Sequence, residues 1–260
     1  SVVDPTQQRA IVITGASTGI GEACTHRLAE AGFHVFAGVR QAADGVALQQ
    51  QIAGSVTPLL LDVTNAAQIA AAQEKVTAIV GVQGLVGLVN NAGIAVGGPL
   101  EFLPIAELQR QMAVNVDGAL AVTQAFLPLL RRATGRIVNM SSISGLAASP
   151  FLGPYAASKY ALEALSDALR LELRPWGIAV ILVEPGNIAT PIWQKGLVFA
   201  DALEPQLPAQ AHAYYGPIFP FLRAMLTSSR GTPAAVVAKV VEQALTVQRP
   251  RARYLVGNDA

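Results

Sequence analysis

The stretch Ile11-Val12-Ile13-Thr14-Gly15-Ala16-Ser17-Thr18-Gly19-Ile20-Gly21-Glu22 decides the fold. An apolar run of strand type leads into three glycines spaced Gly-x-x-x-Gly-x-Gly, and a helix-forming segment follows. Gly15 can make the tight turn after the strand, Gly19 lets the backbone approach a pyrophosphate, and Gly21 allows close packing of helix on strand. The amide hydrogens at the start of the helix then face the phosphates. The stretch predicts a dinucleotide site, although its spacing differs from Gly-x-Gly-x-x-Gly.

Short runs rich in Val and Ile alternate with Ala- and Leu-rich segments along the chain. We expect strands at 10–13, 34–39, 56–61, 85–89, 136–140 and 178–183, and helices at 19–31, 45–52, 66–80, 105–131 and 155–174. The strand runs are almost continuously apolar, as strands covered on both faces are. The alternation predicts an α/β fold with one doubly wound parallel sheet, whose strand order begins 3-2-1-4-5-6. No repeat or charged linker divides the chain, so we expect residues 1–260 to form a single domain.

Composition excludes several classes of function. The chain has 260 residues, 52% of them apolar and 13% charged, and a net charge of +1, so it lacks the concentrated basic face that nucleic acid needs. Cys24 is the only cysteine, which excludes an intrachain disulfide and a cysteine-based metal site, and we expect no metal. No apolar run reaches the ~18 residues of a membrane span. Residues 1–8 lack the regions of a signal peptide, so we expect a cytoplasmic protein.

Tyr155 and Lys159 are candidate catalytic residues. They are four residues apart at the start of a helix-forming run, so they share one face of the helix. A free phenol titrates near pH ~10, and a neighbouring cation would stabilise the phenolate and lower that pKa. Ser142 follows the strand expected at 136–140, where its hydroxyl can donate to a substrate oxygen beside the tyrosine. An interfacial aromatic and a solvated helix lysine remain the alternative interpretation.

The end of the second strand bears on the choice of cofactor. An acidic residue there would bind a ribose 2′-OH, but Val39 and Arg40 occupy this position. A guanidinium suits a 2′-phosphate, which favours NADP(H) over NAD(H), with a solvated loop arginine as the alternative. After the third strand, Asp62 could accept a hydrogen bond from the adenine amino group. It could equally cap the next helix, as could Thr64 or Asn65.

Polar residues also follow the later strands. The segment Asn90-Asn91-Ala92-Gly93 ends the fourth strand and should face the ligand crevice, where Asn90 could fix the loop or touch the cofactor. Asn115 interrupts an apolar helix and needs hydrogen-bond partners. It could hold a water on a proton path to the lysine, or tie two elements together. After the sixth strand, the backbone of Ile188 and the hydroxyl of Thr190 could anchor a nicotinamide carboxamide and a phosphate.

Residues 187–230 interleave aromatic side chains with prolines, which predicts short broken helices. The residues concerned are Trp193, Phe199, Tyr214, Tyr215, Phe219, Phe221 and Met225, with Pro191, Pro205, Pro208, Pro217 and Pro220. Such a segment over the strand ends predicts a lid on an apolar pocket, with ordinary packing or a subunit contact as the alternative. The charges of the lid are Lys195, Asp201, Glu204, Arg223 and Arg230. We expect no cluster among them that would hold a phosphate or a carboxylate.

These motifs together resemble those of the short-chain dehydrogenase/reductase family. The matching set, in family order and spacing, is Thr14-Gly15-x-x-x-Gly19-x-Gly21, Asn90-Asn91-Ala92-Gly93, Asn115, Ser142, Tyr155-x-x-x-Lys159 and Pro185-Gly186. The resemblance implies a Rossmann fold in which Tyr155 is the acid/base and Lys159 lowers its pKa and binds the nicotinamide ribose. It also implies that Ser142 polarises a carbonyl and that Asn115 holds a relay water. Within the family, the sequence pattern of residues 33–40 and of the long lid most resembles that of hydroxysteroid dehydrogenases, retinol dehydrogenases and carbonyl reductases.

The expected cofactor contacts combine the motifs with this resemblance. They are Gly15, Ser17, Thr18, Gly19, Ile20, Gly21, Arg40, Asp62, Val63, Asn91, Ala92, Gly93, Tyr155, Lys159, Pro185, Gly186, Ile188 and Thr190. Ser17 with Arg40 resembles the phosphate-binding pair of NADP-using members. Many such members also carry a basic residue inside the glycine loop, where this chain has Ser17 and Thr18.

The resemblance implies an NADP(H)-dependent oxidoreductase that interconverts a hydrophobic ketone of steroid, retinoid or aryl type and its secondary alcohol. The alternatives are an NAD-dependent alcohol dehydrogenase of the same family, a relative that isomerises or dehydrates its substrate, and a non-catalytic dinucleotide sensor. A hydrolase needs a base beside its nucleophile and is disfavoured, because two of the three histidines, His26 and His34, fall in the dinucleotide half, far from Ser142 in a doubly wound sheet. Apolar and small residues surround much of the helices expected at 105–131 and 155–174, which predicts a homodimer or homotetramer.

Overall fold

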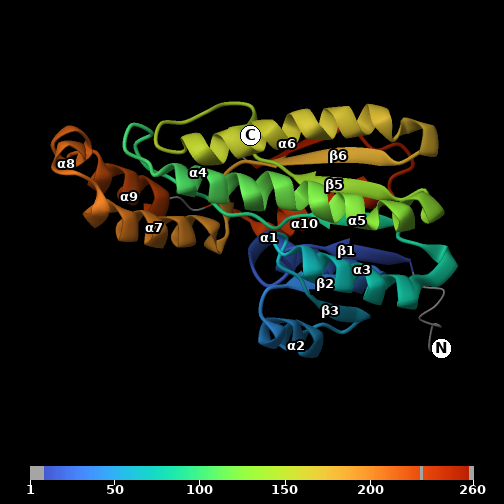
Figure 1. The fold of residues 1–260 in the computed structure, drawn as a ribbon. Helices are drawn as coiled ribbons and strands as arrows, with labels where there is room; N and C mark the ends of the chain where they lie inside the picture. Colours follow the sequence, from blue (N-terminus) through green and yellow to red (C-terminus); the bar gives the residue numbers. More distant parts are fainter. Residues whose placement is uncertain (1–8, 229–230, 258–260) are drawn as a thin grey trace.

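A parallel seven-stranded sheet forms the centre of the molecule, in the order β3-β2-β1-β4-β5-β6-β9 (Figure 1). A computed structural model describes residues 9–228 and 231–257; residues 1–8 and the end of the expected lid, including Arg230, lie outside the described residues. The strands are β1 Ala10–Ile13, β2 His34–Val39, β3 Val56–Leu60, β4 Gly87–Asn90, β5 Arg136–Met140, β6 Ala179–Pro185 and β9 Arg253–Val256. The predicted order 3-2-1-4-5-6 is confirmed. The sequence analysis missed β9, whose pairing with β6 extends that strand to Pro185.

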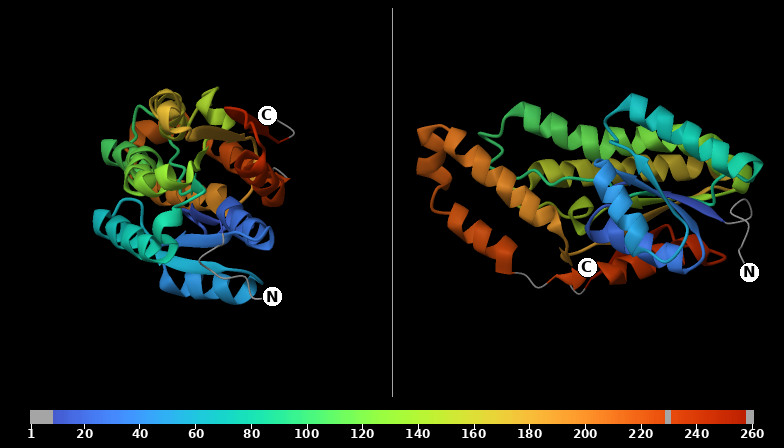
Figure 2. Two further views of the ribbon diagram at one scale, coloured as in Figure 1. Left: turned by 90° about the vertical axis from the view of Figure 1, so that its right-hand side faces the viewer. Right: turned by 90° about the horizontal axis from the view of Figure 1, so that it is seen from below.

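Helices cover both faces of the sheet (Figure 2). The longer helices are α1 Gly19–Glu30, α2 Ala42–Gln51, α3 Ala66–Val80, α4 Ile105–Met112, α5 Gly118–Ala133, α6 Gly153–Glu172 and α10 Ala234–Thr246. Short 3-10 turns are η2 Gly81–Gln83, η4 Ile143–Gly145, η5 Arg174–Trp176 and η6 Glu204–Gln206. One apolar cluster lies between the sheet and α1, α2 and α10, and a second between the sheet and α3 and α5. Because side chains alternate along a strand, Ile11 and Ile13 enter the first cluster and Val12 the second.

The helix predicted at 105–131 is interrupted. A π-helical turn, η3 Ala113–Asp117, separates α4 from α5, and it carries the buried side chain of Asn115. π-Bulges of this kind are frequent at functional sites. Of the described residues, only the stretch Ile105–Ala133 is long and apolar enough to cross a membrane by length and composition, and half of it is buried in the fold. Its α5 part packs on α3 and β4, as the core helix of a doubly wound sheet does.

The lid extends beyond the carboxyl ends of the strands (Figure 1, orange). It consists of α7 Pro191–Leu203, η6, α8 Ala209–Tyr215 and α9 Phe219–Ser228, which confirms the prediction of short broken helices. Prolines occur where these helices start, because the missing amide hydrogen costs nothing in the first turn. A small two-stranded sheet, β7 Ile188–Ala189 with β8 Thr232–Pro233, closes the base of the lid.

Candidate active site

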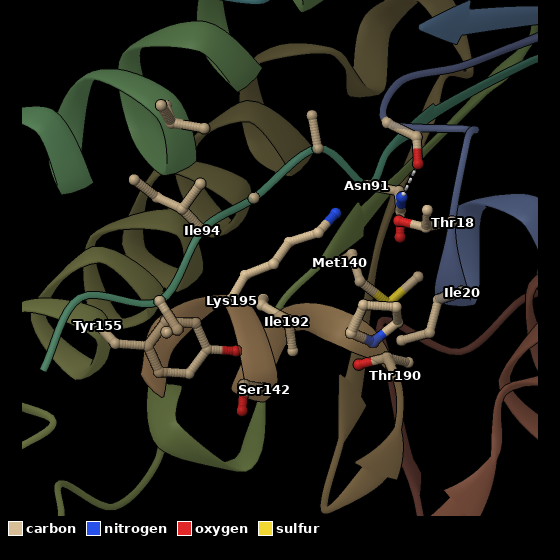
Figure 3. A pocket seen from close by; sticks show the side chains of 18 of the residues that line it. Thr18, Ile20, Asn91, Ile94, Met140, Ser142, Tyr155, Thr190, Ile192 and Lys195 are labelled. Carbon is tan, nitrogen blue, oxygen red and sulfur yellow. Dashed lines mark hydrogen bonds between the residues drawn. The ribbon is translucent and has the colours of Figure 1, made fainter. Parts of the chain in front are cut away.

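A cavity of about 660 Å³ lies where the strands end, between the glycine loop, the ends of β4, β5 and β6, and helix α7 of the lid (Figure 3). The structure brings seventeen of the eighteen expected cofactor contacts to its wall. The exception is Gly21, which lies beneath the loop rather than on the cavity. Of the four expected catalytic residues, Ser142, Tyr155 and Lys159 line the cavity and Asn115 does not.

The glycine loop forms a cradle that a side chain would fill. Gly15 has φ +64°, a conformation that other residues rarely adopt, and an added Cβ would lie 2.8 Å from Ala92 Cα. A Cβ on Gly21 would lie 2.1 Å from the carbonyl oxygen of Gly15. Helix α1 therefore starts directly under the loop, with its first amides directed at the cavity. This geometry fits the pyrophosphate of a dinucleotide.

The two neighbouring asparagines at the end of β4 have different roles. The Asn91 side chain donates to the carbonyl oxygens of Thr14 at 3.1 Å and Gly15 at 3.0 Å, so it holds the glycine loop against the end of β4. Asn90 points into the core, where it donates to Thr123 Oγ1 at 2.9 Å and Asn139 Oδ1 at 2.8 Å. Of its two open roles, Asn90 therefore fixes the strand ends and does not line the cavity.

Arg40 is exposed at the end of β2 and lines the cavity, whereas Val39 is 1% exposed and points into the core. Arg40 and Ser17, which both line the cavity, therefore remain the pair for the 2′-phosphate, and Val39 does not take part. Asp62 Oδ1 accepts from the amide of Thr64 at 2.9 Å and from its hydroxyl at 2.7 Å, and these hydrogen bonds lower the pKa of Asp62. The residue that caps α3 is Asn65, which accepts from the amide of Gln68.

The Tyr155 hydroxyl points toward Ser142 (Figure 3), whose Oγ donates to the carbonyl oxygen of Pro185 at 3.4 Å and accepts from the amide of Ser144 at 3.1 Å. Ser142 follows β5, and Tyr155 lies in the first turn of α6 with only 5% of its surface exposed. Burial raises the pKa of Tyr155, and a hydrogen bond with Ser142 acts in the opposite direction. Burial thus sets the direction of the Tyr155 pKa here, and the lowering by Lys159 that the resemblance implied stays a prediction. Desolvation of the phenolate outweighs the favourable contact with its neighbour.

Lys159 is buried one turn after Tyr155. Its ammonium donates to the carbonyl oxygen of Met140 at 2.7 Å and lies 5.6 Å from the centre of the Tyr155 ring. Burial lowers the pKa of Lys159 to about 8, while the charge of Glu163 raises it. The lysine is thus close to the tyrosine but holds its charge less firmly than an exposed lysine does.

Asn115 is saturated by protein partners. Its Oδ1 accepts from the amide of Ile94 at 2.9 Å, and its Nδ2 donates to the carbonyl of Ile94 at 3.0 Å and to Ser158 Oγ at 3.1 Å. Ser158 in turn donates to the carbonyl of Tyr155 at 2.7 Å. The sequence analysis missed Gln111, four residues before Asn115, which accepts from the amide of Val96 and donates to the carbonyl of Ile94. The helical spacing of these two amides was the available signal.

A second, apolar cavity of about 160 Å³ lies under the lid. Trp193 borders both cavities, and its ring meets that of Tyr155 edge-on at 5.5 Å between centres. Lys195 also lines the main cavity, and its side chain extends into it from α7 (Figure 3). Arg110 lines the same cavity from α4, paired with Glu107 at 2.8 Å. A single lid cation, Lys195, thus reaches the main cavity, which the sequence analysis did not foresee.

Within residues 9–228 and 231–257, no group of three or more His, Cys, Asp or Glu side chains is arranged to hold a metal ion. The family model described as short chain dehydrogenase matches residues 9–197. The chain belongs to the short-chain dehydrogenase family. The predicted family and the Rossmann-type fold are both confirmed.

This short-chain dehydrogenase is 36% identical over 255 residues to the NADPH-dependent 3-dehydrocapnine reductase of Ornithobacterium rhinotracheale, a match that covers 95% of this chain and 88% of that protein. It is 39% identical over 268 residues to the 17-beta-hydroxysteroid dehydrogenase type 6 of Bos taurus, covering 100% and 84%. A solved short-chain dehydrogenase from Streptomyces avermitilis matches with a TM-score of 0.81 at 28% identity, covering 97% of this chain and 90% of that one. The chain is thus an oxidoreductase of the family that acts on CH–OH and ketone groups, and the hydrolase interpretation is set aside.

Proposed function

We propose that this short-chain dehydrogenase interconverts a hydrophobic ketone and its secondary alcohol with NADP(H), using Tyr155 as the acid/base. The observation that carries the proposal is the pair of hydroxyls of Ser142 and Tyr155 at the wall of the dinucleotide cavity, beside Trp193 and the apolar cavity under the lid. The name of the NADPH-dependent relative supports the choice of cofactor. The exposed guanidinium of Arg40 on the cavity, with no acidic residue at the end of β2, supports it independently.

The residues of the cavity fit the parts of the cofactor. The glycine loop and the first amides of α1 would hold the pyrophosphate, Arg40 would pair with the 2′-phosphate, and Asp62 would accept from the adenine amino group. Ile188 of β7 and Thr190, just after it, would hold the nicotinamide end. When bound, NADPH supplies the hydride that adds to the carbonyl carbon.

The protein supplies the proton and stabilises the charge on the reacting oxygen. Ser142 donates a hydrogen bond to the carbonyl oxygen and polarises it. Tyr155 transfers its hydroxyl proton to the same oxygen, so the ketone gains one hydride and one proton and becomes an alcohol. Because burial raises the pKa of Tyr155, the phenol keeps its proton at neutral pH and is ready to donate it. The ammonium of Lys159 stabilises the phenolate that remains, and the same groups act in reverse during oxidation.

The substrate class is tested with a series of ketones of increasing apolar size, from acetone-like compounds to aryl ketones and steroids. The apolar cavity binds by removing surface from water, at about 25 cal/mol per Å². We expect kcat/KM to rise along the series, followed by the loss of NADPH absorbance. A flat or falling trend, or a preference for sugars or acyl thioesters, would contradict the hydrophobic-ketone proposal.

A second candidate substrate is a hydrophobic ketone that also carries an anionic group. Lys195 favours it, because this lid cation lines the main cavity and forms no ion pair with a residue that the structure describes. Arg110 lies on the same wall but is already paired with Glu107. Ketones matched in apolar size, with and without a carboxylate, separate the two candidates. A carboxylate preference that disappears in Lys195→Gln would favour the anionic substrate.

We further propose that residues 1–260 act as one domain in a cytoplasmic homodimer or homotetramer. Exposed apolar side chains on α4 and α6 support the assembly, since Ile105, Tyr160 and Leu171 are each at least 45% exposed. Apolar side chains gathered on exposed helices are typical of subunit contacts. Sedimentation velocity of the full chain tests this, and a purely monomeric protein would contradict it.

A further inference from the structure

Three charged side chains meet one helical turn beyond Lys159, between α6 and the strands β6 and β9. Glu163 lies one helical turn after Lys159, Glu184 lies on β6 directly before the cavity residues Pro185-Gly186, and Arg253 lies on β9. The Arg253 guanidinium is 3.1 Å from Glu163 Oε2 and 3.3 Å from Glu184 Oε1. It is also 2.8 Å from Asp167 Oδ2. The missed strand β9 therefore contributes a cation to this cluster.

The two glutamates are buried and incompletely partnered. The side chain of Glu184 is 0% exposed and that of Glu163 is 9% exposed. Among the described residues, neither oxygen of Glu184 accepts a hydrogen bond, and neither does Oε1 of Glu163. A buried carboxylate without hydrogen bonds is costly. One proton between the two carboxyl groups gives one oxygen of each a partner, because a protonated Glu184 can donate to Glu163.

The electrostatics agree with a shared proton. Burial raises the pKa of Glu184, the charge of Glu163 raises it further, and Arg253 lowers it. Asp167, on the outer side of the cluster, is already paired with Arg170 as well as Arg253. Burial and the charge of Glu163 thus both favour the protonated form of Glu184.

The charge of Glu163 acts on Lys159. Lys159 and Glu163 are four residues apart on α6, and the Glu163 charge raises the pKa that burial of Lys159 has lowered to about 8. Of the other elements packed on α6, η4 contributes the uncharged Ile143-Ser144-Gly145, Glu107 and Arg110 of α4 pair with each other, and Arg174 of η5 is exposed beyond the far end of the helix. Asp117 of η3 is exposed.

We propose that Glu163, held by Arg253 and by a proton shared with Glu184, is the buried counter-ion that keeps the ammonium of Lys159 charged in the active site. Glu163 is thus a positioning residue that acts through Lys159 and does not touch substrate or cofactor. Strand β9 becomes an electrostatic part of the site through Arg253. The inference rests on the proposed role of Lys159.

The test is the pH dependence of the full-length enzyme, measured both as NADPH affinity and as kcat for ketone reduction. In Glu163→Gln, Lys159 should lose its proton at lower pH. We expect the alkaline limb of both profiles to move down by roughly half to one pH unit, with little change near pH ~6. Glu184→Gln mimics the protonated carboxyl and should leave the limb in place. Arg253→Gln removes a positive charge and should move the limb upward.

The matched control is Glu172→Gln, which removes an exposed carboxylate from the same helix. Glu163→Asp should restore most of the wild-type profile. A Glu163→Gln profile that superimposes on the wild type, or an equal shift in Glu184→Gln, would overturn the proposal. If Glu163→Gln does not fold, Arg253→Gln carries the test, and a limb that stays in place overturns it. A wild type that binds NADPH but reduces no ketone would refute the proposed function, while the binding profiles would still test the counter-ion.

Discussion

The side-chain amides of Gln111 and Asn115 donate to the same acceptor, the carbonyl oxygen of Ile94, at 2.9 and 3.0 Å. The two residues are one turn apart across the junction of α4 and the π-helical turn. Together they hold the loop that follows β4 and forms one wall of the cavity. Only Asn115 also reaches Ser158, and through it the backbone of Tyr155.

This difference allows the two roles of Asn115 to be separated. Asn115→Ala and Gln111→Ala should each lower the free energy of unfolding by about 1–3 kcal/mol, because each leaves a loop amide without its acceptor. Only Asn115→Ala should also lower turnover strongly, since it releases Ser158 beside Tyr155. Urea denaturation and kcat, measured side by side, check this. Equal losses of turnover would reduce Asn115 to a loop anchor.

Tyr155→Phe removes one hydroxyl from a buried site. General acid catalysis contributes roughly 10²–10⁴-fold, so we expect turnover to fall at least 10²-fold while NADPH affinity stays near that of the wild type. Ser142→Ala should lower turnover by a somewhat smaller factor. Lys159→Ala should lower turnover and also weaken NADPH binding. Near-normal turnover in a folded Tyr155→Phe enzyme would contradict the assignment of the proton donor.

Arg40 should determine the preference for the phosphorylated cofactor. A charge-assisted hydrogen bond contributes roughly 1.5–3 kcal/mol, so Arg40→Gln should weaken NADP⁺ binding about 10- to 150-fold. NAD⁺ has no 2′-phosphate, so its dissociation constant is the internal control and should hardly change. Val39→Asp is a poor alternative, since that side chain is buried and the carboxylate would be desolvated. A wild type that binds NAD⁺ more tightly at moderate salt would refute the role of Arg40.

Local sequence patterns predicted the parts of the site that belong to one strand end or one helical turn. The glycine loop needs residues without a Cβ, and the Tyr155–Lys159 spacing follows from helix geometry, so both are visible in the sequence. The seventh strand of the sheet, Arg253–Val256, was not visible in the sequence, because it is short and its alternation of apolar and polar residues is weak. The Arg253–Glu184 contact joins segments distant in the chain, and the burial that raises the pKa of Tyr155 is likewise a property of the packed fold.

Trp193 should determine how large a ketone the enzyme accepts. Its ring borders both cavities and packs edge-on against Tyr155, so Trp193→Ala should join the apolar cavity of about 160 Å³ to the main one. A large ketone that buries a further ~50 Å² there would gain about tenfold in kcat/KM. The enzyme should lose activity toward small ketones, because they lose the wall that holds them beside Tyr155.

The measured quantity is the ratio of kcat/KM for a steroid or aryl ketone to that for an acetone-like ketone, with NADPH affinity as a check on the fold. The control is the other tryptophan, Trp176 of η5, which packs on Arg131 of α5 and lines neither cavity. Trp176→Ala should therefore leave the ratio unchanged. An unchanged ratio in Trp193→Ala would mean that substrates do not enter the cavity under the lid.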